Sequence, residues 1–207
     1  MDARRANIVS VRLFTDRMLL GEWACLGVLA EHPAHGYDVS LRLAPAGDVG
    51  RVWSLSRPLT YRALDQLQQR QLAVVVGEER GKAGGMRTIL SPTRRGRNAL
   101  RRWLAEPVEH FRDVRGELLL KLVLCDVAGV DPRPLLESQR RQFAPMIDAL
   151  SIDDAGGDPV ATWREESSRA AMRFIDRLLT TRESSAARRA RRPRSGRGAP
   201  DRSRSDP

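Results

Sequence analysis

The chain has 207 residues, of which 41% are hydrophobic and 5% are aromatic, and its formal net charge is +10. This length and composition are typical of a globular protein with its own core, and so few aromatic residues disfavour a stacking platform for single-stranded nucleic acid. Because no apolar run reaches the roughly 20 residues of a membrane span and the N-terminus lacks the apolar core of a signal peptide, we expect a cytoplasmic protein that contacts no membrane.

The positive charge is concentrated towards the two ends of the chain. Residues 1–106 contain 17 Lys and Arg against 10 Asp and Glu, residues 107–182 contain 11 against 13, and residues 183–207 contain 8 against 3. A basic first part beside a near-neutral middle indicates one module that faces a polyanion and another with a different role, such as self-association. The final segment is rich in Arg, Ser, Pro and Gly, so we expect a disordered basic tail that either binds DNA or only aids solubility.

Two helices are expected in the first 45 residues. Apolar residues at three- and four-residue spacing predict an amphipathic helix that Pro33 closes. Its apolar face consists of Leu19, Trp23, Leu26, Leu29 and Ala30. After a break, the stretch "YDVSLRLA" predicts a short second helix that ends at Pro45.

The third expected helix begins near Arg57 and has a polar outward face. Pro58 suits its first turn, where the missing N–H would be unpaired anyway, and Ser56 or Arg57 occupies the cap position. At 100° per residue, one side of this helix is apolar and should be buried, while the other should face outward. The inward side consists of Thr60, Ala63, Leu64 and Leu67, and the outward side of Pro58, Arg62, Asp65 and Gln69.

A β-hairpin with a basic tip and a fourth helix follow. The β-branched "LAVVV" and the extended "RTIL" flank "EERGKAGGM", whose three glycines predict a long loop. The basic residues at or beside the tip are Arg80, Lys82 and Arg87. The fourth helix begins after Ser91 or Thr93 and ends before Pro107.

This order of helix, helix, helix, hairpin and helix is typical of a winged helix-turn-helix domain. In such a domain the third helix enters the major groove of DNA, and the hairpin, called the wing, reaches the backbone or the minor groove. We therefore expect a mainly α fold with a small β-hairpin wing, in which residues 1–107 form a DNA-binding domain.

The second half of the chain predicts three helices with wide apolar faces. The apolar stripe of "VRGELLLKLVLCDV" is wider than a lone helix can bury, and two long helices flank "SIDDAGGDP". Such faces suit a twofold-symmetric homodimer, so we expect a helical dimerisation domain over residues 108–182 and the disordered tail over 183–207. The candidate dimerisation residues are Leu118, Leu119, Leu122, Phe143, Ile147, Trp163, Phe174 and Leu178. Phe143, Met146 and Trp163 could instead line an effector pocket, but we favour an ordinary dimer core.

Three short motifs occur in a fixed order between residues 18 and 107. They are "HGY" at 35–37, Tyr-x-x-Leu-x-x-Leu at 61–67 and Thr-x-x-Gly-Arg at 93–97. Together they resemble the N-terminal domain of PadR-type bacterial transcriptional regulators, and the block 115–126 is similar to the start of that family's C-terminal helical region, which mediates dimerisation. The chain departs from the family at Pro58, Leu59 and Thr60, and at Gln71, where a glycine often ends the third helix.

The resemblance implies roles in DNA binding for individual residues, each with a structural alternative. Tyr61 is expected at a phosphate, unless its ring packs against the domain, and Arg57 and Arg62 at guanine edges or phosphates, unless they are solvated charges. Tyr37 is expected either near the DNA backbone or in the core. The candidate DNA-contacting residues are Tyr37, Ser56, Arg57, Leu59, Tyr61, Arg62, Gln66, Arg80, Lys82 and Arg87.

The resemblance and the charge pattern together predict a transcriptional regulator. We expect a homodimer that binds a pseudo-palindromic operator in double-stranded DNA, as a repressor, because occlusion of a promoter requires only tight binding. Two other functions stay open, a protein-interaction adaptor and a sequence-blind, nucleoid-type DNA binder. Whether a small-molecule effector also binds is open.

Catalytic and metal-binding motifs are missing from the sequence. It has no Gly-rich phosphate-binding loop of the Walker or dinucleotide type, no Gly-x-Ser-x-Gly and no His-Glu-x-x-His. Cys25 and Cys125 both lie within apolar runs, so we interpret them as core thiols rather than as metal ligands or disulfide partners. We expect neither an enzyme nor a bound cofactor or metal ion.

Overall fold

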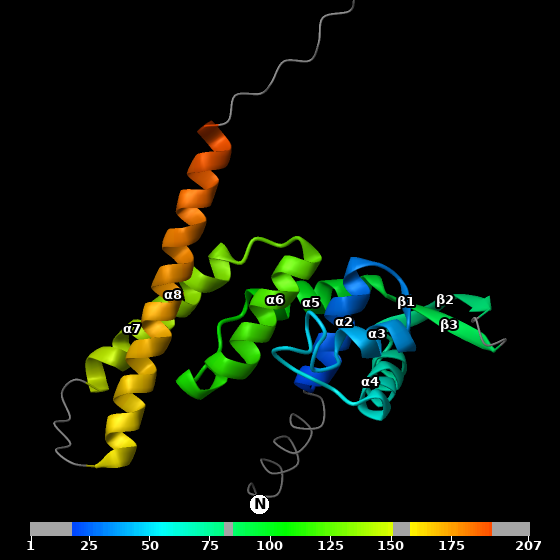
Figure 1. Cartoon of the computed structure of the whole chain (residues 1–207), viewed down its shortest axis with the longest axis horizontal. Helices are drawn as coiled ribbons and strands as arrows, with labels where there is room; N and C mark the ends of the chain where they lie inside the picture. Colours follow the sequence, from blue (N-terminus) through cyan, green and yellow to red (C-terminus); the bar gives the residue numbers. More distant parts are fainter. Residues whose placement is uncertain (1–17, 81–84, 151–157, 192–207) are drawn as a thin grey trace, which may run out of the picture.

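In the computed structural model, which describes residues 18–80, 85–150 and 158–191, the first apolar run forms helix α2 (Leu20–Glu31) at the centre of the N-terminal part (Figure 1). The helices that pack around it are α3 (Gly36–Arg42), α4 (Arg57–Gln69), α5 (Arg94–Ala105) and α6 (Leu119–Ala128). Because neighbours surround α2, it is buried on nearly all sides rather than on one face. The expected apolar position of Leu19 is wrong, since this residue precedes the helix and is 71% exposed.

A three-stranded antiparallel sheet forms the wing, with strand order β1-β3-β2. Its strands are β1 (Ala34–His35), β2 (Ala73–Arg80) and β3 (Met86–Pro92). The hairpin of β2 and β3 confirms the prediction, and a β-bulge between Val75 and Gly77 shifts its register. The short strand β1 is not predicted by the sequence, and it fastens the start of α3 to the wing because β1 pairs with β3.

Two polar details connect α4, the wing and α5. Thr93 caps α5, since its side chain accepts a hydrogen bond from the backbone N–H of Gly96 (3.0 Å). The same hydroxyl donates to the backbone carbonyl of Gln71 (2.9 Å). Gln71 has φ 58°, in the left-handed region that favours glycine, which gives a physical reason why a glycine would suit this position.

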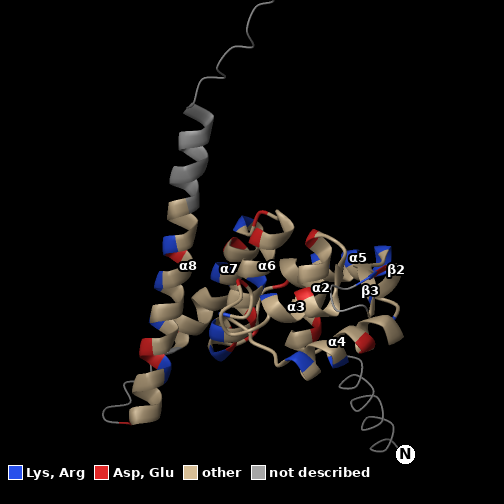
Figure 2. Ribbon diagram, turned by 45° about the vertical axis from the view of Figure 1, so that its right-hand side comes forward, with Lys and Arg blue, Asp and Glu red and all other residues tan. Residues whose placement is uncertain are grey.

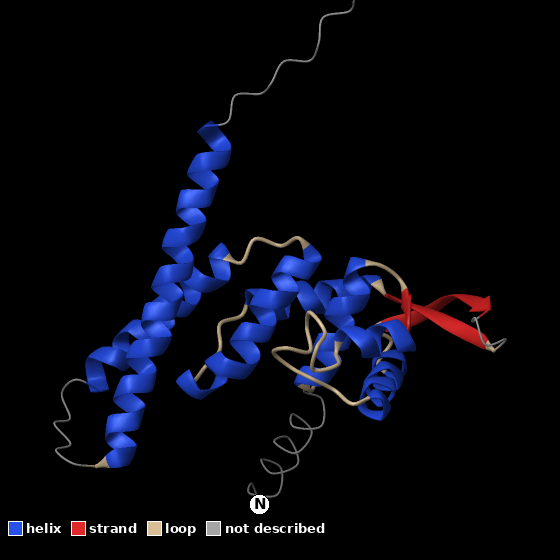
Figure 3. Ribbon diagram, viewed as in Figure 1, coloured by secondary structure: helices blue, strands red, loops and turns tan. Residues whose placement is uncertain are grey.

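The C-terminal half forms a second, helical part. After η1 (Phe111–Asp113), η2 (Val114–Leu118) and α6, the antiparallel helices α7 (Arg133–Leu150) and α8 (Pro159–Arg191) lie at the opposite end of the molecule from the wing (Figures 1 and 3). These helices confirm the predicted elements. The backbone of α8 continues to Arg191, into the segment for which the sequence predicts disorder. The rest of that segment, 192–207, lies outside the described residues.

The cores of the two parts do not divide at residue 107. Leu120, Leu124 and Cys125 of α6 are buried in the N-terminal core together with α2. Gly27 of α2 permits this close approach, because a Cβ there would lie 2.5 Å from Cδ2 of Leu124. The predicted domain boundary therefore needs correction, since helix α6 completes the core that covers α2. A separate core beneath α7 and α8 consists of Val108, Leu118, Leu122, Leu135, Leu136, Phe143 and Ile175.

Both cysteines are buried and neither forms a disulfide, which confirms their interpretation as core thiols. Burial raises the pKa of the Cys25 thiol far above its ordinary value. Among the described helices, none is long and apolar enough to cross a membrane.

Candidate nucleic-acid interface

Helix α4 presents the outward face that its sequence predicts. Its four predicted inward residues are buried, and the opposite side is exposed. Exposed residues on this face include Arg57, Arg62, Leu59 at 50% and Tyr61 at 43%. Ser56 is the N-cap residue, as expected, but its side chain makes no capping hydrogen bond.

Two arginines meet at the ring of Tyr37. The guanidinium carbon of Arg57 lies 5.0 Å from the ring centroid, and that of Arg87 lies 5.5 Å from it. A cation at these distances is attracted by the quadrupole of an aromatic ring. Tyr37 on α3 therefore gathers one cation from α4 and one from the wing. The sequence offers no signal for this grouping, because it depends on the pairing of β1 with β3.

The ring of Tyr61 packs against the domain, as one of its two predicted alternatives states, although 43% of the residue is exposed; its contact with a phosphate stays a prediction. A Cβ atom on Gly36 would lie 2.7 Å from Cε1 of Tyr61. Gly36 thus leaves the space that the ring occupies, and it is a residue whose role the sequence analysis missed. Gln66, further along α4, is half-buried, and its side-chain amide donates to the side chain of Gln69 (3.2 Å).

The wing carries acidic as well as basic residues. Arg80 lies opposite Met86 and Arg87 opposite Glu79, while Glu78 and Glu79 are both exposed. Figure 2 shows basic residues on the hairpin and α5, and both acidic and basic residues on other helices. Lys82 lies outside the described residues.

A hollow of about 510 Å³ opens between α3, α4 and β3. Residues that line it include His35, Tyr37, Tyr61, Asp65 and Arg87. The structure thus brings Tyr37, Tyr61 and Arg87 to one hollow, and Arg57 meets them through the ring of Tyr37. Arg62 is exposed on α4 and Arg80 at the end of β2, and neither lines this hollow.

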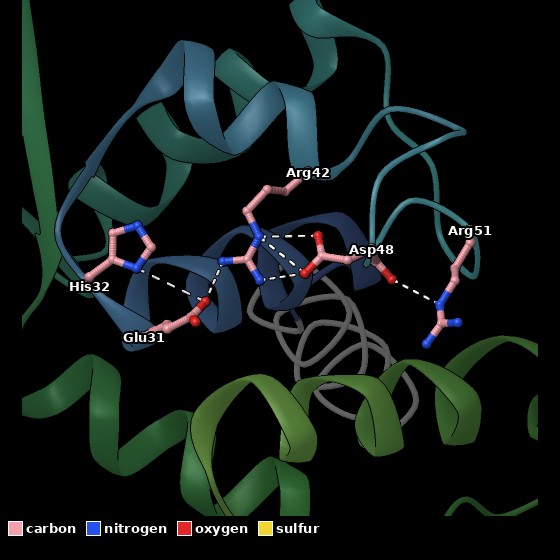
Figure 4. Close-up of polar contacts among 5 residues, drawn as sticks. All are labelled: Glu31, His32, Arg42, Asp48 and Arg51. Carbon is pink, nitrogen blue, oxygen red and sulfur yellow. Dashed lines mark hydrogen bonds and ion pairs between the residues drawn. The ribbon is translucent and has the colours of Figure 1, made fainter.

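An ion-pair network fixes the loop that leads into α4 (Figure 4). The guanidinium of Arg42 donates to the carboxylate of Asp48 through Nε (3.1 and 3.2 Å) and also to Glu31 at the end of α2. Arg51 donates to the backbone carbonyl of Asp48 (3.0 Å). These contacts join the ends of α2 and α3 to the loop 43–56, in which Trp53 packs against the N-terminal core.

We predict that the Asp48→Asn variant loses less stability in acid than the wild type. The hydrogen bonds from Arg42 hold the pKa of the Asp48 carboxyl below its usual range. A depressed folded-state pKa stabilises the fold above the unfolded pKa of about 4, and this contribution disappears as pH falls through the folded value. Because Asp48 is half exposed, we expect only roughly 0.2–1 kcal/mol.

The measurement is the free energy of unfolding of both proteins between about pH 7 and pH 2. The wild type should be more stable at neutral pH, and the difference should shrink below about pH 4. If the difference in unfolding free energy between the two proteins stays constant with pH, the charge of Asp48 does not contribute to stability.

The predicted dimerisation residues divide into two groups. Leu118, Leu122 and Phe143 are buried within a single chain, so they support the helical core and offer no surface to a partner. Trp163, in contrast, is 72% exposed. The half-buried members are Leu119, Ile147, Phe174 and Leu178.

An apolar groove of about 1240 Å³ runs along this half of the molecule. Its lining includes Phe111, Val114, Leu119, Met146, Trp163 and Phe174. Phe143 lies in the core rather than in this lining, so only Met146 and Trp163 of the three suggested pocket residues reach the groove. In the described part of the chain, no three His, Cys, Asp or Glu residues gather as they would to hold a metal ion.

Comparisons with known proteins find similarity only at the level of structure. No protein-family model and no curated protein matches the chain. PadR of Bacillus subtilis in complex with operator DNA has a TM-score of 0.43 and 18% identity, covering 79% of this chain and 99% of that chain. The Vibrio cholerae virulence activator AphA has a TM-score of 0.36 and 22% identity, covering 82% and 98%. Bacillus subtilis PadR in complex with p-coumaric acid has a TM-score of 0.35 and 18% identity, covering 80% and 97%.

Structures of PadR are thus among those to which the chain is similar. With identities near 20% and TM-scores below 0.5, these similarities carry no argument about function. We therefore base the function on the geometry of α3, α4 and the wing.

Proposed function

We propose that this protein is a DNA-binding transcriptional regulator that places α4 in the major groove of a duplex. An α-helix fits the major groove of B-form DNA, where arginine side chains can read guanine and apolar groups can contact the thymine methyl. Arg62 is suited to the first role and Leu59 to the second, since both are exposed on the outward side of α4.

The single observation that carries this proposal is the grouping of Arg57 and Arg87 at Tyr37. Two like charges beside one ring repel each other, so the arrangement is favourable chiefly when an anion lies near both. In the described part of the chain, neither arginine forms an ion pair with an acidic residue. A backbone phosphate between α4 and the wing would meet both charges, and it would fix the register of α4 on the duplex.

Selection of bound duplexes from a random pool tests the proposal and separates it from the two alternatives. A regulator should return a consensus sequence, and its affinity should fall steeply as salt rises, through release of counterions. A nucleoid-type protein should show the same salt dependence without a consensus. An adaptor should bind no duplex at any salt concentration, which would overturn the proposal.

The Gly36→Ala variant should bind the selected duplex about tenfold more weakly than the wild type, a loss of roughly 1.4 kcal/mol. The added methyl group would overlap the ring of Tyr61 and push it from its position on α4. The fold should persist, because alanine is favourable in a helix and Gly36 has no left-handed backbone to accommodate.

The measurement is fluorescence anisotropy with the selected duplex, beside thermal unfolding as a check of the fold. The variant Tyr61→Phe is the matched control, since it keeps the ring in place and removes only the hydroxyl. Equal affinity of Gly36→Ala and the wild type would show that the position of Tyr61 is unimportant for binding.

We further propose that the protein is a homodimer formed through the groove and the adjoining face of α8, and that it acts as a repressor. Trp163 and Val160 on α8 are 72% and 53% exposed, and the groove beside them has mainly apolar walls. Exposed apolar surface of this kind is typical of interaction sites. Twofold symmetry would present two α4 helices to successive major grooves, about 34 Å apart.

The Trp163→Glu variant should weaken dimerisation by roughly 30-fold or more, because a buried interface tryptophan commonly contributes about 2 kcal/mol or more. Sedimentation velocity over a range of concentrations measures this effect. Thr162→Glu is the matched control, since it adds the same charge to an exposed neighbour outside the groove. If the two variants dimerise equally well, Trp163 is not at the interface.

A further inference from the structure

The short linker between α5 and η1 is held by a side chain from α7. The backbone N–H of Val108 donates to Oε1 of Gln139 (2.7 Å), and the backbone carbonyl of Val108 accepts from Nε2 of the same side chain (2.9 Å). Nε2 of Gln142 donates to that carbonyl as well (3.0 Å). Gln139 is fully buried although it is polar, and its amide pairs with the linker as a neighbouring strand would.

These bonds fix an orientation that apolar packing alone would leave adjustable. Dispersion contacts between the leucine side chains of the helical core have no preferred direction, so they fix an orientation less strictly than hydrogen bonds do. Two hydrogen bonds that run in opposite directions between one amide and one backbone residue tolerate little change in orientation. A lost bond would leave a buried polar group unpaired, which is unfavourable in free energy.

The same linker is also held from the N-terminal part. Nζ of Lys121 donates to the backbone carbonyl of Glu106 (2.6 Å) and lies 3.0 Å from Oε1 of Glu117. That carboxylate accepts a hydrogen bond from Nε1 of Trp103 (3.1 Å). Lys121 is 1% exposed, so this polar group lies in the interior.

Trp103 connects these polar contacts to the centre of the N-terminal core. Trp103 stacks on Trp23 of α2, with ring centroids 4.8 Å apart and an angle of 4° between the planes. Helix α2 packs directly against α4. The linker 106–108 is therefore held on one side by the part of the molecule that carries α4, and on the other by α7.

We infer that Gln139, assisted by Gln142, is a positioning residue that sets the angle between the α4-bearing part and the α7–α8 pair. This inference rests on the proposed function, because its consequence is the spacing of two α4 helices in the homodimer. A fixed angle would select one spacing between the two half-sites of the operator. Both glutamines lie on α7 and not on α3, α4 or the wing, so any effect on DNA would act through geometry.

The first experiment measures the angle in the protein alone. Spin labels are attached through Arg94→Cys on α5 and Arg177→Cys on α8, both at exposed positions, while the buried native thiols react poorly. Labelled chains are diluted with unlabelled ones so that only distances within a chain are recorded. The labelled protein with the native Gln139 should give one narrow distance distribution. Gln139→Met, which keeps the side-chain volume, should give a broad distribution.

The second experiment measures the spacing preference on DNA. The duplex recovered by random-pool selection is compared with versions in which about five base pairs, half a helical turn, separate the half-sites further. The wild type should lose roughly 100-fold in affinity, because only one of its two α4 helices can then bind. Gln139→Met should lose less than about tenfold on the same insertion, and it should bind a single half-site as well as the wild type does.

Gln142→Met and Ser138→Ala complete the design. Gln142→Met removes only one of the two donors to the Val108 carbonyl, so it should broaden the distance distribution and relax the spacing preference less than Gln139→Met does. If Gln139→Met fails to fold, the result for Gln142→Met tests the inference. Ser138→Ala, on the same helix, should behave as the wild type. Narrow distances and an unchanged spacing preference in the folded glutamine variants would overturn the inference. If the wild type binds no duplex, the proposed function fails, and the spin-label distances still decide whether Gln139 sets the angle.

Discussion

A chain that ends at residue 107 is expected to lack a stable fold, whereas one that ends at residue 130 should fold as a monomer. The difference between them is α6, which supplies Leu120, Leu124 and Cys125 to the core around α2. The two leucines are fully buried, and each contributes about 1.5–3 kcal/mol. Their combined loss, about 3–6 kcal/mol, reaches the lower end of the total stability of a small domain, roughly 5–15 kcal/mol.

Urea unfolding followed by circular dichroism tests this expectation. The fragment 1–130 should unfold cooperatively, while 1–107 should show no cooperative transition. Leu124→Ala in the full chain is the matched control, since it removes part of the same contact and should lower the unfolding free energy by about 2–5 kcal/mol. Equal unfolding midpoints for the two fragments would show that the winged helix needs no cover from α6.

The elements of the fold could be predicted because their signals are local. The periodicity of Thr60, Ala63, Leu64 and Leu67 determines which side of α4 is buried, and glycines mark the turn of the hairpin. Pro58 near the start of α4 and Thr93 before α5 mark where these helices begin, as capping preferences predict.

The grouping of the candidate site could not be predicted, because it depends on contacts between distant segments. Tyr37 and Arg87 are neighbours only because β1 pairs with β3, and a two-residue strand has no periodic signal. Arg42 and Asp48 could be exposed charges in any loop, and only the packing of α2 against α3 brings Glu31 to the same guanidinium.

The apolar stripes of the C-terminal half show a different limit. A wide apolar stripe indicates that other apolar side chains must cover it. It does not indicate whether those side chains belong to the same chain or to a partner. Leu118, Leu122 and Phe143 are covered within the chain, and Trp163 is not. The distinction requires the relative positions of α6, α7 and α8, which follow from the helical core as a whole.

Replacing both Arg57 and Arg87 by alanine should weaken binding to the selected duplex by roughly 100-fold at physiological salt, because two phosphate contacts are lost. Each guanidinium that contacts a phosphate releases one counterion. The slope of the logarithm of affinity against the logarithm of salt concentration should therefore become shallower by about one unit per arginine. Arg101→Ala is the matched control, because it removes one charge from an exposed position on α5 outside the candidate interface.

Tyr37→Leu tests whether the two arginines act together through the ring. Leucine fills much of the same space but has no quadrupole, so the attraction of about 0.5–2 kcal/mol for each cation is lost. Arg57→Ala should then weaken binding less in the Tyr37→Leu background than in the wild type, because the arginine is no longer held in place. A double-mutant cycle measured by anisotropy gives this coupling. Additive effects, or losses no larger than that of Arg101→Ala, would mean that the guanidinium pair at Tyr37 is a feature of the surface and not the site that holds DNA.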